Sequence, residues 1–196
     1  MPPDDAIRTL GSVYADAVNS KVLTTFLVAM GTACAAANGP PSSEPGSAAA
    51  TPSAGSSAIL AEHNRLRAAH CAAPLAWSAK LEKSAQAWAD HLRDSGCAFE
   101  HSGGSSGENL AGGSIGAMDG AGVVRYWYDE SAHYKYSTGR FSAETGHFTQ
   151  VVWGSTREVG CGTSQCKGMD VWVCQYDPPG NVSGAFAENV KAKGCR

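Results

Sequence analysis

Gly146-His147-Phe148-Thr149-Gln150-Val151-Val152-Trp153 is the stretch that decides the fold, because it joins a titratable side chain to a dense apolar run. Histidine changes its charge near neutral pH and is a common metal ligand. Val151, Val152 and Trp153 are expected in the core, since burial stabilises large apolar side chains. The stretch therefore predicts that the imidazole of His147 is held at the boundary of a hydrophobic interior.

Three upstream stretches supply polar groups that match this imidazole. They are His101-Ser102, Gly107-Glu108-Asn109-Leu110 and Trp127-Tyr128-Asp129-Glu130. A carboxylate in line with apolar residues on one helix face is unusual unless it is paired or used, and Glu130 follows Val123 and Trp127 in this way. We therefore expect one cleft, framed by the rest of the chain, that is lined by His101, Glu108, Glu130 and His147.

Length and composition bound the class of protein. The 196 residues fit one domain, or one domain with a tail. A formal net charge of −3 gives no indication of a nucleic-acid-binding surface. The contents of 43% hydrophobic and 17% charged residues are typical of a soluble globular protein. No apolar run is long enough to predict a transmembrane helix.

The first 57 residues differ in composition from the rest. Residues 1–37 form an extension in which Lys21, a short apolar run and a small-residue end resemble a signal peptide, which predicts a secreted or surface-tethered, extracellular protein. Thr32-Ala33-Cys34 resembles a bacterial lipoprotein cleavage box, so Cys34 is a candidate lipid anchor; the alternative is a cysteine inside a discarded signal. Residues 38–57 are rich in Gly, Pro, Ser and Ala and predict a flexible linker. The folded domain is expected over 58–196.

Seven cysteines indicate the redox compartment. Six of them follow residue 70 and are spread along the domain, which predicts three disulfides and an oxidising compartment. Zinc is the alternative, since Cys161 and Cys166 are close in sequence, but no second close pair completes a four-ligand site. Cys166 and Cys174 flank an expected hairpin turn at 167–170, and this makes them the preferred pair.

Apolar periodicity predicts helices over 58–70, 79–95 and 120–132. The second is the clearest, with Ser78 as its expected N-cap. Short strands are expected over 98–101, 158–162 and 169–176. The glycine-rich residues 102–113 and the polar residues 133–145 read as loops. Helices at the start and middle with strands at the end predict an α+β or layered α/β domain.

Several motifs, in this order, resemble one known family. They are His63-Asn64-Arg65-Leu66-Arg67, Leu75-Ala76-Trp77, Ala85-Gln86-Ala87-Trp88-Ala89, His101-Ser102, Gly107-Glu108-Asn109-Leu110-Ala111, Trp127-Tyr128 with Glu130, 146–153 and 173–181. The set resembles the CAP superfamily of cysteine-rich secretory proteins, antigen 5 and pathogenesis-related protein 1. The resemblance implies a three-layer α-β-α sandwich with a small antiparallel sheet and a central cleft. It also implies that the cleft holds His101, Glu108, Glu130 and His147.

Metal binding is the first chemistry expected of this cleft. The imidazoles of His101 and His147 would hold Zn²⁺ or another divalent metal, with Glu108 and Glu130 as further ligands or as partners that fix the rings. The alternative is a structural polar network. For Glu108 a helix capping box over 105–108 is a further structural alternative.

Two functions are expected from these features together with the family resemblance, which implies lipid or sterol binding for several members. The preferred one is an extracellular module that binds a lipid, a sterol or another ligand, with Ile115 and Met118 of the flexible stretch 112–118 as apolar contacts; that stretch is otherwise a plain connector. The alternative is a metal-dependent hydrolase, a protease or esterase, that uses the same four cleft residues. Ser102 lacks a nucleophile-elbow pattern. A binding protein is therefore preferred over an enzyme, with a lipid or an extracellular protein as partner.

Overall fold

The structure is a computed structural model that describes residues 53–195. The signal-like segment, the lipid-anchor candidate Cys34 and most of the predicted linker lie outside these residues. The helices and strands, in chain order, are α1 (Ala54–Ala69), β1 (Ala76–Trp77), α2 (Ala79–Asp94), β2 (Gly107–Ser114), α3 (Gly120–Asp129), the 3₁₀ turns η1 (Glu130–Ala132) and η2 (Ala143–Thr145), α4 (Gly146–Val151), β3 (Glu158–Cys166), β4 (Met169–Asp177) and α5 (Phe186–Asn189). None of these helices is long and apolar enough to cross a membrane.

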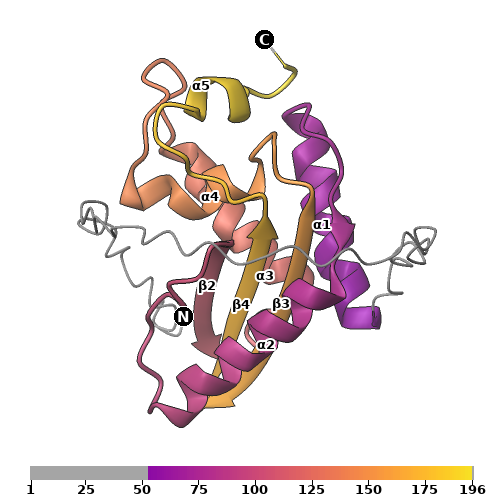
Figure 1. Cartoon of the computed structure of the whole chain (residues 1–196), viewed down its shortest axis with the longest axis vertical. Helices are drawn as coiled ribbons and strands as arrows, with labels where there is room; N and C mark the ends of the chain where they lie inside the picture. The colour runs from indigo at the N-terminus through magenta and orange to yellow at the C-terminus, as the bar shows by residue number, and fades with distance from the viewer. Residues whose placement is uncertain (1–52, 196) are drawn as a thin grey trace, which may run out of the picture. The chain divides into compact units, whose positions relative to one another are not determined.

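The four strands form one sheet in the order β1-β3-β4-β2 (Figure 1). β3 and β4 are an antiparallel hairpin, β2 is antiparallel to β4, and the short β1 is parallel to β3. The hairpin turns at Lys167 and Gly168, whose φ angles of 48° and 79° are both positive. Positive φ at both central residues is the requirement of the tightest hairpin turn. This fixes the register of β3 against β4.

The sheet separates two hydrophobic clusters and so forms the middle of three layers. On one face Ala85, Ala89 and Leu92 of α2 pack against Val171 and Val173. On the other face α1, α3 and α4 pack against the opposite side chains of the same strands, with Trp127 and Trp153 almost completely buried. In Figure 1 α2 crosses the front of the sheet and α3 lies behind it. The predicted α-β-α sandwich with a small, mainly antiparallel sheet is confirmed.

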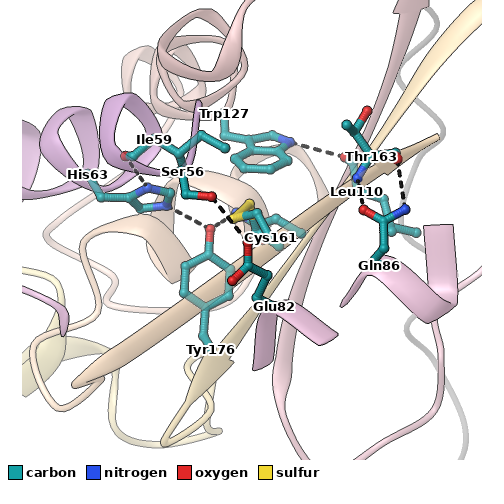
Figure 2. The surroundings of a disulfide bond; sticks show 12 residues. Ser56, Ile59, His63, Glu82, Gln86, Leu110, Trp127, Cys161, Thr163 and Tyr176 are labelled. Carbon is teal, nitrogen blue, oxygen red and sulfur yellow. Dashed lines mark hydrogen bonds between the residues drawn. A yellow bond between two sulfur atoms is a disulfide. The ribbon is translucent and has the colours of Figure 1, made fainter. Parts of the chain in front are cut away.

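Glycines in β3 let α2 lie directly on the sheet backbone. A Cβ added to Gly160 would lie 2.1 Å from the Glu82 nitrogen, and one added to Gly162 would lie 2.3 Å from the Gln86 Cα. The Gln86 side chain also pairs with the free edge of β3: its Oε1 accepts from the Thr163 amide, and its Nε2 donates to the Thr163 carbonyl (Figure 2). The amide group thus takes the place of a neighbouring strand and covers this edge.

The helix predictions hold in position but differ at the ends. α1 begins at Ala54 rather than 58, where Ser53 accepts a hydrogen bond from the Ser56 amide as its N-cap. α2 matches its predicted range closely, but the predicted cap Ser78 makes no side-chain capping bond. α3 ends at Asp129, and the chain tightens into η1 over the residues predicted as its last turn.

The region 98–114 was predicted wrongly. Residues 98–101 form no strand, whereas the glycine-rich stretch that reads as a loop forms β2 and pairs with β4 along its full length. Packing explains the glycine at 112, because a Cβ there would lie 2.2 Å from the ring of Phe99. Phe99 therefore fills the space of the missing side chain, and the tertiary contact overrides the loop-favouring composition.

Three disulfides form, as predicted, but the preferred pair Cys166–Cys174 is wrong. The bonds join Cys71 to Cys195, Cys97 to Cys166 and Cys161 to Cys174. The two-residue hairpin turn places Cys161 directly opposite Cys174 and Cys166 opposite Met169. Cys166 is then left to bond with Cys97, which follows the end of α2.

Buried polar groups of α1 attach it to the rest of the domain. Arg67 is fully buried and donates to four backbone carbonyls, those of Ala73, Val151, Trp153 and Thr156. His70 is 1% exposed and bonds the hydroxyl of Tyr128 and the carbonyl of Lys191. The helix is therefore held by hydrogen bonds as well as by its narrow apolar face.

Candidate functional site

Glu130 orients His147 and starts the helix that carries it. Its Oε1 accepts from His147 Nδ1 at 2.6 Å, and its Oε2 accepts from the amides of His147 at 3.0 Å and Phe148 at 3.1 Å. Thr145, at the N-cap of α4, makes no side-chain capping bond. A carboxylate is favoured at a helix N-terminus, where amide groups lack partners. One side chain, brought from the end of α3, thus caps α4 and fixes the ring.

Glu108 holds His101 in a second pair of the same kind. Glu108 Oε1 accepts from His101 Nδ1 and from the Ser102 amide, both at 2.9 Å, and its Oε2 accepts from Gln175 Nε2 at 3.0 Å. Burial opposes ionisation of this carboxyl, but the hydrogen bonds from His101, Gln175 and Ser102 together outweigh burial and lower the pKa of Glu108. Glu108 is therefore a carboxylate at neutral pH.

The two pairs share one chemical consequence. Where a carboxylate accepts from Nδ1–H, the neutral ring carries its lone pair on Nε2. This is the arrangement of metal-binding histidines, in which an outer carboxylate fixes the tautomer and raises ligand basicity. The His101 and His147 side chains are 25% and 14% exposed, so both lie at the boundary between core and solvent. The predicted boundary position of His147 is confirmed.

Both pairs border β2, the edge strand of the sheet. Glu108 lies on the α2 face, because it is opposite Gln175 and Gln175 is opposite Gly160, which contacts α2. Asn109 points to the other face, where its Nδ2 donates to the His147 carbonyl at 3.1 Å. Glu108 belongs to one pair and Asn109 bonds the other, and as successive residues of β2 they point to opposite faces of the sheet.

The structure brings the four predicted residues together in twos. Among residues 53–195, no three His, Cys, Asp or Glu side chains are placed so that they could hold one metal ion. A site with all four residues as ligands is therefore not assembled in this structure. A metal ion shared by the two imidazoles, with the carboxylates behind them, stays a prediction.

A buried hydrogen-bond chain supports the site from α1. His63 Nδ1 bonds the Ile59 carbonyl and its Nε2 bonds the Tyr176 hydroxyl, each at 2.9 Å (Figure 2). Asn109 donates to the same hydroxyl at 3.4 Å. His63 is therefore neutral, with Nδ1–H as donor and Nε2 as acceptor. Burial lowers the pKa of His63 to about 4 and raises that of Tyr176.

This neutral His63 predicts a loss of stability in acid. Its pKa of about 4 in the folded chain lies below the ordinary value of 6.5, so the unfolded state binds more protons between these values. Stability from this residue is complete above pH 6.5 and is lost as the pH falls toward 4. Between pH 7 and 4.5 we expect the free energy of unfolding to fall by about 2 kcal/mol through His63.

Urea unfolding of the full chain and of His63→Gln at both pH values measures this effect. The glutamine amide has a donor and an acceptor but does not titrate in this range, so the variant should show a smaller loss of stability on acidification. An equal loss in both proteins would show that His63 is not the group responsible.

Gln175, Asn109 and Arg67 received no role from the sequence. The sequence does contain a signal for Gln175. Val171, Val173 and Gln175 alternate along one strand and share one face, so a polar side chain lies among apolar ones. Asn109 and Arg67 carried no comparable signal. The capping box proposed for Glu108 is wrong, because the chain there is β2 and not a helix.

The stretch predicted to contact a lipid is divided in the structure. Gly112 and Gly113 belong to β2. Ile115 is 53% exposed, whereas Met118 is partly buried against the main core. The two side chains therefore have different surroundings, and the predicted lipid contact stays a prediction.

Comparison with known families and proteins gives one consistent result. The family model described as CAP, cysteine-rich secretory protein family, matches residues 60–176. "Protein PRY2" of Saccharomyces cerevisiae is 46% identical, over 69% of this chain and 40% of its own length. "Secreted protein RBT4" of Candida albicans is 38% identical, over 97% of this chain and 57% of its own length. The chain thus spans about half the length of these two relatives.

A plant relative and a solved structure agree with them. "Pathogenesis-related protein 1" of Arabidopsis thaliana is 39% identical, over 62% of this chain and 75% of its own length. The solved structure described as "Crystal structure of NaASP2 with Zn2+" is 30% identical, with a TM-score of 0.57, and the match covers 71% of this chain and 86% of that one. A venom allergen-like protein of Schistosoma mansoni, at 23% identity and a TM-score of 0.56, shares the fold.

Proposed function

The chain belongs to the cysteine-rich secretory protein (CAP) family, and from this premise we propose that it is an extracellular binding protein whose two imidazoles bind a divalent metal ion, Zn²⁺ foremost. The observation that carries the proposal is the pair of Nδ1–carboxylate bonds, His101 to Glu108 and His147 to Glu130. In each pair the carboxylate bonds Nδ1–H, so Nε2 and its lone pair lie on the side of the ring that points away from the carboxylate.

Two observations support an extracellular location. Disulfides persist in oxidising compartments and are rare in the cytosol, and this domain has three. The relative from Candida albicans is named a secreted protein. Tethering through Cys34 is a further proposal, and that residue lies outside the described part of the chain.

The donor set fits a weak, exchangeable ion. Two imidazole nitrogens are fewer than the three protein ligands of a typical catalytic zinc site, so water would complete the coordination. Glu108 and Asn109 of β2 each contact one pair, so an ion shared by the two imidazoles would lie next to this strand. The solved structure at 30% identity is described with Zn²⁺, which supports zinc as the first ion to test. A bound ion would supply a Lewis acid to whatever ligand the domain takes.

Glu130→Gln is expected to weaken Zn²⁺ binding by about 10- to 100-fold, the usual effect of removing a carboxylate behind a ligating histidine. The amide keeps the size of the side chain but loses the charge that orients His147 and raises its basicity. Titration calorimetry with Zn²⁺ on the full chain measures the change. Glu144→Gln is the matched control, because Glu144 is an exposed carboxylate on η2. Equal affinities in the two variants would mean that Glu130 does not serve a metal ligand.

A hydrolase remains the alternative to a binding protein. It uses the same four residues and predicts turnover of an ester or peptide that is lost in His101→Ala and in His147→Ala. The family resemblance also supports a lipid or sterol ligand, and we propose the exposed Ile115 as its apolar contact. A binding protein without catalysis should keep its ligand when these histidines are replaced, provided that the ligand site lies elsewhere.

A further inference from the structure

A cavity of about 640 Å³ is lined by α2, by the loop after His101 and by the paired ends of β3 and β4. α2 contributes Lys80, Ser84, Trp88 and His91, which recur at helical spacing, and the loop contributes residues 102 and 104–106. This volume is in the usual range for small-molecule sites, about 300–1,000 Å³. The cavity is distinct from the glycine-rich stretch 112–118 that the lipid prediction invokes.

Hydrogen-bond acceptors collect in this cavity. Gln175 lines it and is 4% exposed; its Nε2 donates to Glu108, and its Oε1 has no hydrogen-bond partner within residues 53–195. A buried acceptor without a donor costs about 1–3 kcal/mol. Glu158 and Asp177 also line the cavity and lie directly opposite each other on β3 and β4. Like charges in this position repel each other. Lys80 is the cation among the residues that line the cavity, so acidic side chains exceed basic ones by one, and the site favours groups that donate hydrogen bonds over anions.

Two aromatic side chains also line the cavity. The rings of Trp88 and His91 are stacked, with centroids 4.5 Å apart and planes 21° from parallel. The indole is fixed in place, because Trp88 Nε1 donates to the Glu100 carbonyl at 3.0 Å. Serine hydroxyls at 78, 84, 102, 105 and 106 add groups that both donate and accept. The lining is therefore aromatic on one side and rich in hydroxyl and acceptor groups elsewhere.

We propose that this cavity binds a neutral saccharide. Sugar hydroxyls donate to the exposed carboxylates of Glu158 and Asp177 and accept from the serines, while the C–H face of a sugar ring packs on the aromatic side chains. A lipid chain would leave the polar lining without partners. The inference goes beyond metal binding and does not rest on it, since it is carried by residues that do not include His101 or His147.

Calorimetric titration of the full chain with two neutral probes, laminarihexaose and N-acetylchitohexaose, tests the proposal. At least one should bind, and Ser84→Tyr, which fills the cavity from an exposed position of α2, should weaken that binding at least tenfold. Lys83→Tyr is the matched control: it places the same ring on the next residue, which is exposed and does not line the cavity. Ser84→Tyr should keep its Zn²⁺ affinity, so that a failure here is separable from a failure of the metal site.

Three results would overturn the proposal. One is that neither hexasaccharide binds. Another is that Ser84→Tyr binds the saccharide as tightly as the unaltered chain, which would place the sugar elsewhere. The third is that tetralysine binds with sensitivity to Ser84→Tyr while the saccharides do not, which would assign the acidic pair at 158 and 177 to a basic peptide.

Discussion

Arg67→Met is expected to lower the free energy of unfolding by more than about 3 kcal/mol. The guanidinium is fully buried, and burial lowers its pKa only to about 10, so the group is charged at neutral pH. Its partners are four carbonyls, two of which, at 151 and 153, close the C-terminal end of α4. Methionine fills much of the same volume but donates nothing. The buried Val151 carbonyl would then lose its donor, whereas the Trp153 and Thr156 carbonyls would keep one bond each, from the Thr156 amide and the Arg157 guanidinium.

Arg65→Met is the matched control, because it lies on the same helix and is exposed, with one ion pair to Glu62. The Arg65 end of this pair is exposed, and the buried Glu62 carboxylate keeps Arg125 at 3.7 Å, so we expect a loss of about 1 kcal/mol or less. Chemical denaturation of both variants gives the comparison. If Arg67→Met lowered the free energy of unfolding no more than Arg65→Met does, the hydrogen bonds of the buried guanidinium would not be what holds α1 against the end of α4.

Gly160→Ala is expected to destabilise the domain by about 3 kcal/mol or more. The added Cβ would lie 2.1 Å from the Glu82 nitrogen and 2.6 Å from the Leu81 carbonyl carbon. Both atoms are backbone of α2, so no side-chain rotation relieves the overlap and the helix must move off the sheet. The same movement would disturb Gln175, which lies opposite Gly160, and through it Glu108.

Gly104→Ala is the control for this substitution. Its nearest neighbour is the Ser102 hydroxyl at 3.6 Å, an ordinary contact, and its φ is not in the left-handed region. It should change stability by less than about 0.5 kcal/mol, the usual range for surface substitutions. A thermal or urea midpoint for Gly160→Ala close to that of Gly104→Ala would contradict the direct packing of α2 on β3.

The positions of α1, α2 and α3 and the four residues of the site are predicted from the sequence for physical reasons, whereas the helix α4 that carries His147 and the division of the four residues into two pairs are not. Clear apolar spacing located α2, and the two strands of the hairpin followed from alternation and turn residues. Glu130 was singled out because a carboxylate in an apolar row of a helix needs a partner, and the structure supplies His147. These inferences use neighbours that are close in sequence or share one element.

The errors concern contacts between segments that are distant in sequence. β2 has the composition of a loop, and only its pairing with β4 and the ring of Phe99 make it a strand. The pairing of Cys161 with Cys174 depends on a hairpin register that is set by the turn at 167 and 168. His70 is buried by contacts with Tyr128 of α3 and with Lys191 of the C-terminal segment. None of these contacts has a local signature.

The central claim is that the two carboxylate-held imidazoles bind one metal ion. Zn²⁺ titration of the full chain beside the double variant His101→Ala/His147→Ala tests it most directly, with circular dichroism to show that both are folded. We expect one Zn²⁺ per chain, bound saturably and lost in the double variant, because the carboxylates alone offer no site in which three ligands converge. Saturable binding that survives in the double variant, or no binding in the unaltered chain, would contradict the claim and leave the two pairs as a polar network that joins α3, α4 and β2.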